Sequence, residues 1–138
     1  MKKETILSIL KEIRDALKPV TAPIKSEIVI QGNLMWGKTL PKKMTWDEAK
    51  QACKKLATGG YKDWRLPTIK ELISIIDYSK YEPAVIDGIK EYQSDLYWSN
   101  TTYADYTAGA WFVYFYNGLV YYGGKAFSCY VRPVRGGQ

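Results

Sequence analysis

The sequence predicts a single α+β domain with a strand-rich C-terminal half, preceded by a short N-terminal helix. Two helix-start signals fall in the middle of the chain, after one strand-like segment and before a long run of strand and turn residues. This order differs from the regular alternation of strands and helices in α/β proteins. The length of 138 residues also suits one substantial core.

Residues 1–25 are predicted to be an N-terminal helix and a connector, followed by a ligand-binding domain over 26–138. Apolar residues recur at helical spacing over residues 4–18, and the helix stops at Pro19. The stretch from Pro19 to Pro23 is a stiff connector. The apolar stripe is too short for a self-sufficient coiled coil. It either docks on the domain or brings copies of the chain together.

The first elements of the domain are a strand and a helix. Residues 27–31 alternate apolar and polar side chains as a strand does, and residues 33–36 extend it after Gly32. Thr45 and Glu48 form a capping box, which begins a helix that ends at Gly59-Gly60.

A second capping box, Thr68 with Glu71, follows Pro67 and opens another helix. Its inward side is expected to carry Leu72, Ile75 and Ile76. Residues 83–95 are predicted to be a loop with a short helical piece. Everything after Leu96 reads as strands and turns, closing with residues 131–134.

The most informative segment runs from Tyr97 to Tyr130. It holds eight of the twelve tyrosines and only two charged side chains, Asp105 and Lys125. Within it, two apolar strands flank Asn117-Gly118, the signal of a two-residue hairpin turn. That turn pairs Tyr116 with Leu119, Tyr114 with Tyr121, and Phe112 with Gly123.

The predicted hairpin has two different faces. The better core face holds Trp111, Val113, Phe115, Val120 and Tyr122. The other face would present a continuous apolar surface to solvent, which a soluble monomer rarely shows without a partner. It consists of Phe112, Tyr114, Tyr116, Leu119 and Tyr121.

The alternative is that both faces are buried inside a larger antiparallel stack. Two observations weigh against it. The small residues Gly123-Gly124 and 126–129 fill little volume, and each tyrosine hydroxyl needs a partner in a dry core. Tyrosine mixed with Gly, Ser and Asn is instead typical of antibody-like contact surfaces. We therefore interpret the hairpin as a binding face.

Composition argues against several classes of function. The net charge is +6, but the lysines are scattered and segregated from the aromatic segment, so we expect no nucleic-acid binding. There is no histidine, which excludes imidazole catalysis and the commonest zinc sites. Charged residues interrupt any signal-peptide core, and no apolar run approaches ~20 residues. We expect a soluble chain without membrane insertion.

Five ordered motifs resemble a known family. They are Leu34-Met35-Trp36, Met44-Thr45-Trp46-Asp47-Glu48-Ala49, Gly60-Tyr61-Lys62-Asp63-Trp64-Arg65-Leu66-Pro67-Thr68, Tyr97-Trp98-Ser99 and Tyr130-Val131-Arg132-Pro133-Val134-Arg135-Gly136. Together they resemble the C-terminal domain of collagen-like adhesins, the Lcl C-terminal domain family, over about residues 27–138. The resemblance implies a C-type lectin fold, with two helices packed on antiparallel sheets.

The C-terminal stretch most resembles the variable proteins of diversity-generating retroelements, in which a reverse transcriptase rewrites adenines. Rewritten Asn codons yield types such as Phe, Tyr, Ser, Gly, Ala, Leu, Cys and Asp, but never Lys or Trp. The ligand-binding positions implied are Phe112, Tyr114, Tyr116, Leu119, Tyr121, Tyr122, Gly123, Gly124, Ala126, Phe127, Ser128 and Cys129. The implied scaffold is Trp64, Arg65, Trp98, Trp111 and Lys125. Tyr122 conflicts with its inward assignment above.

One departure from the family concerns cysteine. The family often has Cys where Pro133 stands, as a partner for a cysteine in the first helix. We therefore expect Cys53 to be an unpaired buried thiol and Cys129 to be a product of variation. A Cys53–Cys129 bridge is the alternative.

These observations predict a non-catalytic binding protein without cofactor or metal, whose ligand is a protein or other macromolecule. Display on a virion or cell surface is compatible with it. The alternative is an adhesin-like carbohydrate-binding lectin, although the calcium-binding triplets of lectins are absent. Enzymes that generate formylglycine share the fold but use paired cysteines. Asp63-Trp64-Arg65 is better explained as an ion pair that braces the second helix than as a catalytic acid.

Overall fold

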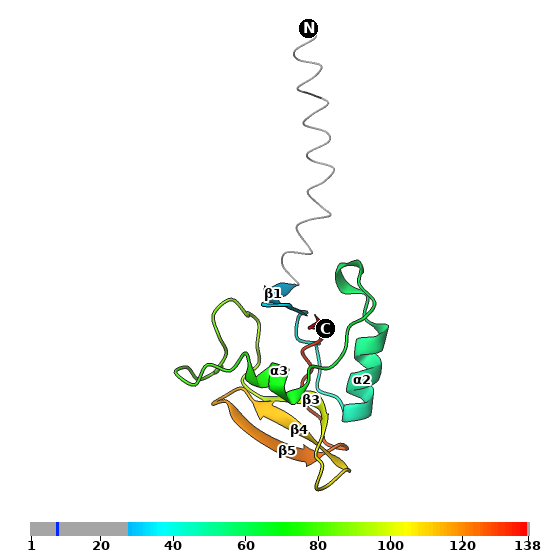
Figure 1. The fold of residues 1–138 in the computed structure, drawn as a ribbon, viewed down its shortest axis with the longest axis vertical. Coiled ribbons are helices and arrows are strands. Elements are labelled where there is room, and N and C mark those ends of the chain that lie inside the picture. The colour runs from blue at the N-terminus through cyan, green and yellow to red at the C-terminus, as the bar shows by residue number, and fades with distance from the viewer. Residues whose placement is uncertain (1–7, 9–27, 138) are drawn as a thin grey trace.

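A computed structural model describes Ser8 and residues 28–137 of the chain (Figure 1). The predicted N-terminal helix and connector therefore lie outside the described residues. Over residues 28–137 the fold contains two α-helices and two three-stranded antiparallel sheets, which confirms the α+β class. The helices are α2 (Trp46–Lys55) and α3 (Ile69–Ile73).

The first sheet joins the two ends of the domain. It has the order β1-β2-β6, with β1 (Val29–Gln31), β2 (Leu34–Trp36) and β6 (Val134–Gly136). The sequence suggested one strand extended past Gly32, but the chain reverses there, and Gln31 pairs with Leu34. Gly32 has φ +63°, which favours glycine in a tight reversal.

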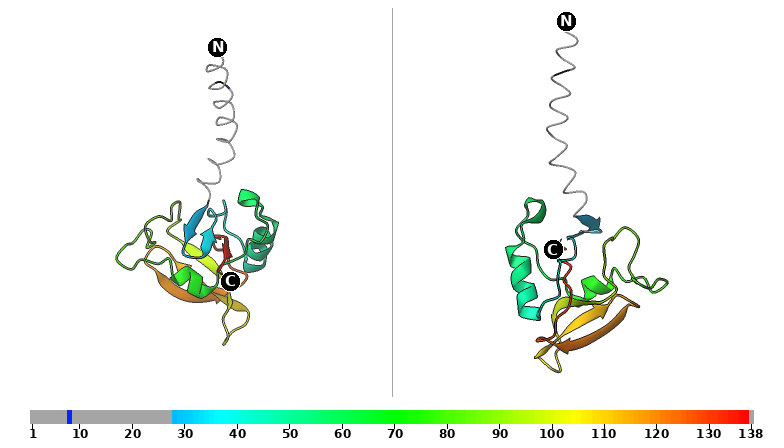
Figure 2. Two further views of the ribbon diagram at one scale, coloured as in Figure 1. Left: turned by 45° about the horizontal axis from the view of Figure 1, so that its top comes forward. Right: turned by 180° about the vertical axis from the view of Figure 1, so that it is seen from behind.

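The second sheet lies at the opposite end of the domain from β1, with α3 between them and α2 along one side (Figures 1 and 2). Its order is β3-β4-β5, with β3 (Leu96–Thr102), β4 (Gly109–Tyr114) and β5 (Leu119–Gly124). β5 is an edge strand of this sheet. The prediction of strands and turns after Leu96 is confirmed.

Both capping boxes are present. The backbone amide of Thr45 donates to Glu48 Oε1 at 2.9 Å, and that of Thr68 donates to Glu71 Oε1 at 2.8 Å. However, α2 ends at Lys55, before Gly59-Gly60, and these two glycines belong to a 3-10 turn over Thr58–Gly60.

The second helix is shorter than the apolar pattern suggested. Leu72 and Ile75 are fully buried as expected, but Ile76 leaves the helix and forms a β-bridge with Val85. The predicted helical piece within residues 83–95 is wrong, because this segment contains only turns, bends and that bridge. Long-range pairing with the segment around Val85 thus ends the helix early.

The core has two clusters, one on each side of the strands β3 and β4. The first includes Tyr97, Val113 and Phe115 together with Leu72 of α3. The second includes Trp98 and Ala110 together with residues of α2. Adjacent residues of β3 therefore point into different clusters, and both faces of β3 and β4 are covered. The expectation of one wholly outward face is wrong for β4.

The register of the hairpin also differs from the prediction. Tyr114 pairs with Leu119 and Phe112 with Tyr121, so residues 115–118 form a longer connection than an Asn-Gly turn. The position of Phe115 explains the longer connection. It is fully buried, and its backbone bonds to Asp95 and Ala84 rather than across the hairpin. The slip is by an even number of residues, so each side chain keeps its predicted face.

Candidate ligand-binding face

The predicted ligand-binding positions occupy the edge of the second sheet and the segment after it. The most exposed large side chains among them are Phe127 (69% exposed), Tyr121 (54%), Leu119 (52%) and Tyr116 (40%). Ala126 and Ser128 are also exposed, whereas Phe112, Tyr114, Tyr122, Gly123 and Gly124 are half-buried. The positions therefore divide into three groups: exposed, half-buried and, for Cys129 alone, buried.

The edge position of β5 explains this division. Leu119 and Tyr121 stand on the last strand of the sheet, where no further strand or helix of residues 28–137 covers them. On the adjacent strand, Phe112 is partly covered, because its ring meets the buried Trp98 edge-on at 6.1 Å between centroids. The face opens to solvent from β4 towards β5.

The rings on this face contact one another. Tyr114 stacks on Tyr116 at 5.8 Å, and Phe112 meets Tyr121 at 6.4 Å. Leu119 lies opposite Tyr114 across the hairpin, on the same face as the two ring pairs. We call Phe112, Tyr114, Tyr116, Leu119 and Tyr121 the aromatic face. It is continuous along the hairpin and carries no charged side chain.

Tyr122 lies on the other side of β5, as its inward assignment predicted. Its ring stacks on Tyr103 at 3.8 Å with an angle of 4° between the planes, and meets Trp111 at 6.3 Å. Tyr103 and Trp111 also contact each other, at 5.0 Å. The Tyr122 ring is therefore packed against the rings of Tyr103 and Trp111.

The two glycines of β5 leave room for neighbouring rings. A Cβ atom on Gly123 would lie 2.8 Å from Phe112 Cε2, so any other residue would displace the Phe112 ring. At Gly124 a Cβ atom would be 3.5 Å from the Phe127 ring, which is an ordinary contact. Position 123 thus controls the shape of the aromatic face more tightly than position 124.

Cys129 corrects the predicted ligand-binding set. Its side chain is fully buried in the second cluster, and its backbone pairs with that of Met44 in both directions. It therefore does not reach the surface. Cys53 is also buried, both thiols are free, and burial raises the pKa of each to about 12. The expectation of an unpaired, buried Cys53 is confirmed, and the alternative disulfide does not form.

The predicted scaffold residues hold the strands beneath the face. Trp98 is fully buried, and its indole N–H donates to the Met44 carbonyl at 3.0 Å. The Trp64 indole donates to the Thr58 carbonyl at 3.1 Å. The Lys125 ammonium lies 4.0 Å from the Trp46 ring centroid and thereby ties the turn after β5 to α2.

Arg65 braces the second helix, but through a different partner from the expected one. Its guanidinium donates to both carboxylate oxygens of Glu71, at 2.8 and 2.9 Å, and to the Gly136 carbonyl at 2.9 Å. Burial opposes ionisation of Glu71, but hydrogen bonds from Arg65 and Thr68 outweigh it and lower the pKa. Asp63 pairs with Arg135 instead. The predicted Asp63–Arg65 pair is therefore wrong.

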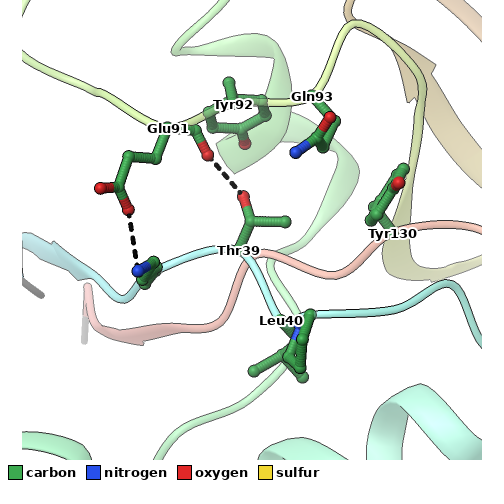
Figure 3. A pocket seen from close by; sticks show the side chains of 8 residues that line it. Thr39, Leu40, Glu91, Tyr92, Gln93 and Tyr130 are labelled. Atoms are coloured by element: carbon green, nitrogen blue, oxygen red, sulfur yellow. Dashed lines mark hydrogen bonds and ion pairs between the residues drawn. The ribbon is translucent and has the colours of Figure 1, made fainter.

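A pocket of about 680 Å³, which sequence reasoning missed, lies between residues 38–41 and 91–93 (Figure 3). The Thr39 hydroxyl donates to the Glu91 carbonyl at 3.1 Å, and Lys38 pairs with the Glu91 carboxylate at 3.3 Å. Tyr92 and Tyr130 supply two rings of the wall. Residues 39 and 91 are far apart in sequence, so no local pattern indicated the pocket.

A buried arginine supports the pocket from behind. Arg132 is 3% exposed, and its Nη1 donates to the Lys90 carbonyl at 2.8 Å and to Thr39 Oγ1 at 3.2 Å. Burial lowers the pKa of this guanidinium. The contacts tie the two walls of the pocket together.

The described residues show neither a metal-binding cluster nor a membrane-spanning helix. Among these residues, no three His, Cys, Asp or Glu side chains gather where they could hold a metal ion. Among the described helices, none is both long and apolar enough to span a bilayer.

The fold defines the class of the described residues as an α+β domain. A family model, the Lcl C-terminal domain, matches residues 30–135. The chain therefore belongs to the Lcl C-terminal domain family, which indicates an adhesin-like binding domain. A search of curated proteins found no match.

Proposed function

We propose that this chain is a non-catalytic binding protein that presents a hypervariable, tyrosine-rich surface on a C-type lectin scaffold. Its ligand is a protein or other macromolecule, and it acts at the surface of a virion or cell. The observation that carries the proposal is the aromatic face: five neighbouring, mostly aromatic side chains on the β4–β5 hairpin, three of them at least 40% exposed. A soluble domain rarely leaves such a surface without a partner.

The different roles of backbone and side chains in the hairpin support diversification by a retroelement. The β4–β5 pairing is made by backbone groups, which do not depend on side-chain identity. The buried residues Val113 and Phe115 face the core from the same hairpin and hold it in place. Side chains on the other face can therefore change while the strands remain anchored.

Recognition would use shape and aromatic contact. Tyr116 and Tyr121 provide stiff rings with a hydroxyl that can bond to a ligand, and a tyrosine loses little conformational entropy on binding. Gly123 lets the Phe112 ring lie close to β5 and thereby determines the local shape of the aromatic face.

Sequencing the gene with its 3′ flank tests the origin of the surface. We expect a near-copy of the segment that encodes residues 112–129, differing only at adenines and adjacent to a reverse transcriptase gene. A flank without such a copy would refute diversification but not binding.

Binding itself is tested with a phage-displayed library randomised at Tyr114, Tyr116, Leu119 and Tyr121, selected on immobilised ubiquitin as a defined folded protein with a net charge near zero. We expect specific binders whose melting temperatures stay within a few degrees of the parent. A library that yields only unfolded or non-binding members contradicts the proposal.

Carbohydrate binding is the second candidate, and the pocket in Figure 3 favours it. The pocket offers the Tyr130 ring for stacking beside the polar groups of Thr39 and Gln93. A glycan array would show binding that resists chelator and is lost in Tyr130→Ala. Binding that requires calcium, or that persists in this variant, would contradict use of the pocket.

A further inference from the structure

A loop outside the predicted variable stretch is attached directly to the hairpin. The Glu82 amide donates to the Tyr116 carbonyl at 2.8 Å, and the Ala84 amide donates to the Phe115 carbonyl at 2.7 Å. The Tyr78 hydroxyl donates to the Gly118 carbonyl at 2.9 Å. Three hydrogen bonds therefore fix residues 78–84 against the connection between β4 and β5.

This loop exposes two aromatic rings, Tyr81 beside the aromatic face and Tyr78 beside the hairpin turn. Tyr81 is 71% exposed and Tyr78 is 68% exposed. The Tyr81 ring meets Tyr116 edge-on at 6.3 Å, and Tyr116 stacks on Tyr114. The exposed aromatic surface therefore continues from the hairpin onto the loop.

The loop packs tightly on the turn. A Cβ atom at Gly118 would lie 2.7 Å from Tyr78 Cε1 and 2.8 Å from Ile76 Cγ2. Gly118 also has φ +84°. This close approach holds the Tyr78 ring in a defined position, so its exposure is a property of the fold.

We propose that Tyr78 and Tyr81 form a fixed part of the binding face, and that the ligand which covers both parts is a folded protein with a flat, largely uncharged surface. This inference rests on the proposed function. The variable side chains would select the ligand, and the two fixed tyrosines would contribute contact area to every complex.

The area of the combined surface indicates the size of the partner. A tyrosine can bury about 200 Å². Applied to the exposed fractions of Tyr78, Tyr81, Tyr116, Leu119 and Tyr121, this gives about 600 Å². The half-buried members of the aromatic face bring the surface towards the ~800 Å² that each partner contributes to a standard protein interface. A small ligand would cover only a fraction of it.

The charges near the surface indicate the chemistry of the partner. The aromatic face has no charged side chain. The loop beside it carries the exposed Glu82 and one lysine, Lys80, which pairs with Asp87 and with Asp77 at 3.9 Å. The loop charges are of both signs and none lies on the aromatic face, so a strongly charged partner would gain little attraction there. A protein surface of polar and apolar groups fits better.

The test uses the ubiquitin binders selected from the library described above, with Tyr78 and Tyr81 unchanged during selection. Tyr81→Ser and the double variant Tyr78→Ser/Tyr81→Ser are then introduced into several independent binders. We expect affinity, measured by surface plasmon resonance, to fall at least 10-fold in most binders. The matched control is Ile30→Ser, because Ile30 is 68% exposed but lies on β1 at the opposite end of the domain. It should change affinity less than 2-fold.

The outcomes separate this inference from the proposed function. Binders that keep their affinity in Tyr81→Ser overturn the inference and leave the proposed function intact, whereas a selection without binders refutes the proposed function itself. Circular dichroism checks that each variant folds. If the double variant unfolds, the test rests on Tyr81→Ser alone, because Tyr81 makes no hydrogen bond to Gly118. If light scattering shows a dimer of the parent chain that Tyr81→Ser dissociates, the partner is a second copy, which overturns the proposed ligand.

Discussion

Alanine substitution at Phe115 and at its neighbour Tyr116 separates the buried from the exposed side of the hairpin connection. Phe115 is fully buried, and its ring lies 4.5 Å from that of Tyr92 and 5.4 Å from that of Tyr97. Tyr116 is 40% exposed and contacts only the Tyr114 and Tyr81 rings among aromatic side chains of the described residues.

The expected costs differ severalfold. Removing a buried phenylalanine costs about 3–5 kcal/mol, through lost burial and the cavity left behind. An aromatic pair contributes about 0.5–1.5 kcal/mol, and partial exposure of Tyr116 places its total loss near 1 kcal/mol. For a chain of this length the difference corresponds to roughly 6–15 °C in melting temperature.

Urea unfolding followed by circular dichroism measures both variants, with an unchanged m-value as the check that unfolding stays comparable. If Phe115→Ala does not fold, Phe115→Leu provides a milder loss of volume at the same position. Equal destabilisation by Tyr116→Ala and Phe115→Ala would mean that Tyr116 belongs to the core. The aromatic face would then be a structural layer and could not serve as a binding surface.

Three further predictions concern the scaffold. Gly118→Ala should destabilise the fold by about 1–3 kcal/mol in urea, because of the positive φ and the missing space; an unchanged midpoint contradicts the close packing. The pKa of Glu71 is lowered in the fold from its ordinary value of 4.5. Its pairing with Arg65 therefore stabilises the folded state above pH 4.5, and this stabilisation is lost as pH falls through the folded pKa. Glu71→Gln should therefore lower the free energy of unfolding at pH 7 and weaken its dependence on pH in the acid range. An unchanged pH dependence would contradict this. Because burial raises the pKa of Cys53 and Cys129 to about 12, neither thiol should react with a disulfide reagent at pH 8 until urea unfolds the chain; rapid native reaction would show exposure.

The features that the sequence predicted correctly are those set by neighbouring residues. Each capping box depends on two residues three positions apart, Thr45 with Glu48 and Thr68 with Glu71, and both form. The separation of the hairpin side chains into two faces depends only on alternation along a strand. It survives the register error because the slip is even.

The features that the sequence could not supply depend on distant contacts. The Asn-Gly signal predicts a short turn, but bonds from Phe115 to Asp95 and Ala84 draw it out of the hairpin. The length of α3 fails for the same reason, because Ile76 pairs with Val85. Tertiary pairing overrides local turn and helix preferences in both cases.

The burial of Cys129 limits which side chains of the C-terminal stretch can be varied. Its backbone pairs with Met44 and its side chain lies in the second cluster, so a large or polar residue there would disturb the packing of α2. Tyr121 and Leu119, by contrast, stand on an edge strand that no other element within the described part of the chain covers. A codon-rewriting process acts on sequence without regard to this difference. Functional variation would therefore concentrate at the edge strand and the turn, beside the fixed rings of Tyr78 and Tyr81, while position 129 would be restricted to small apolar side chains.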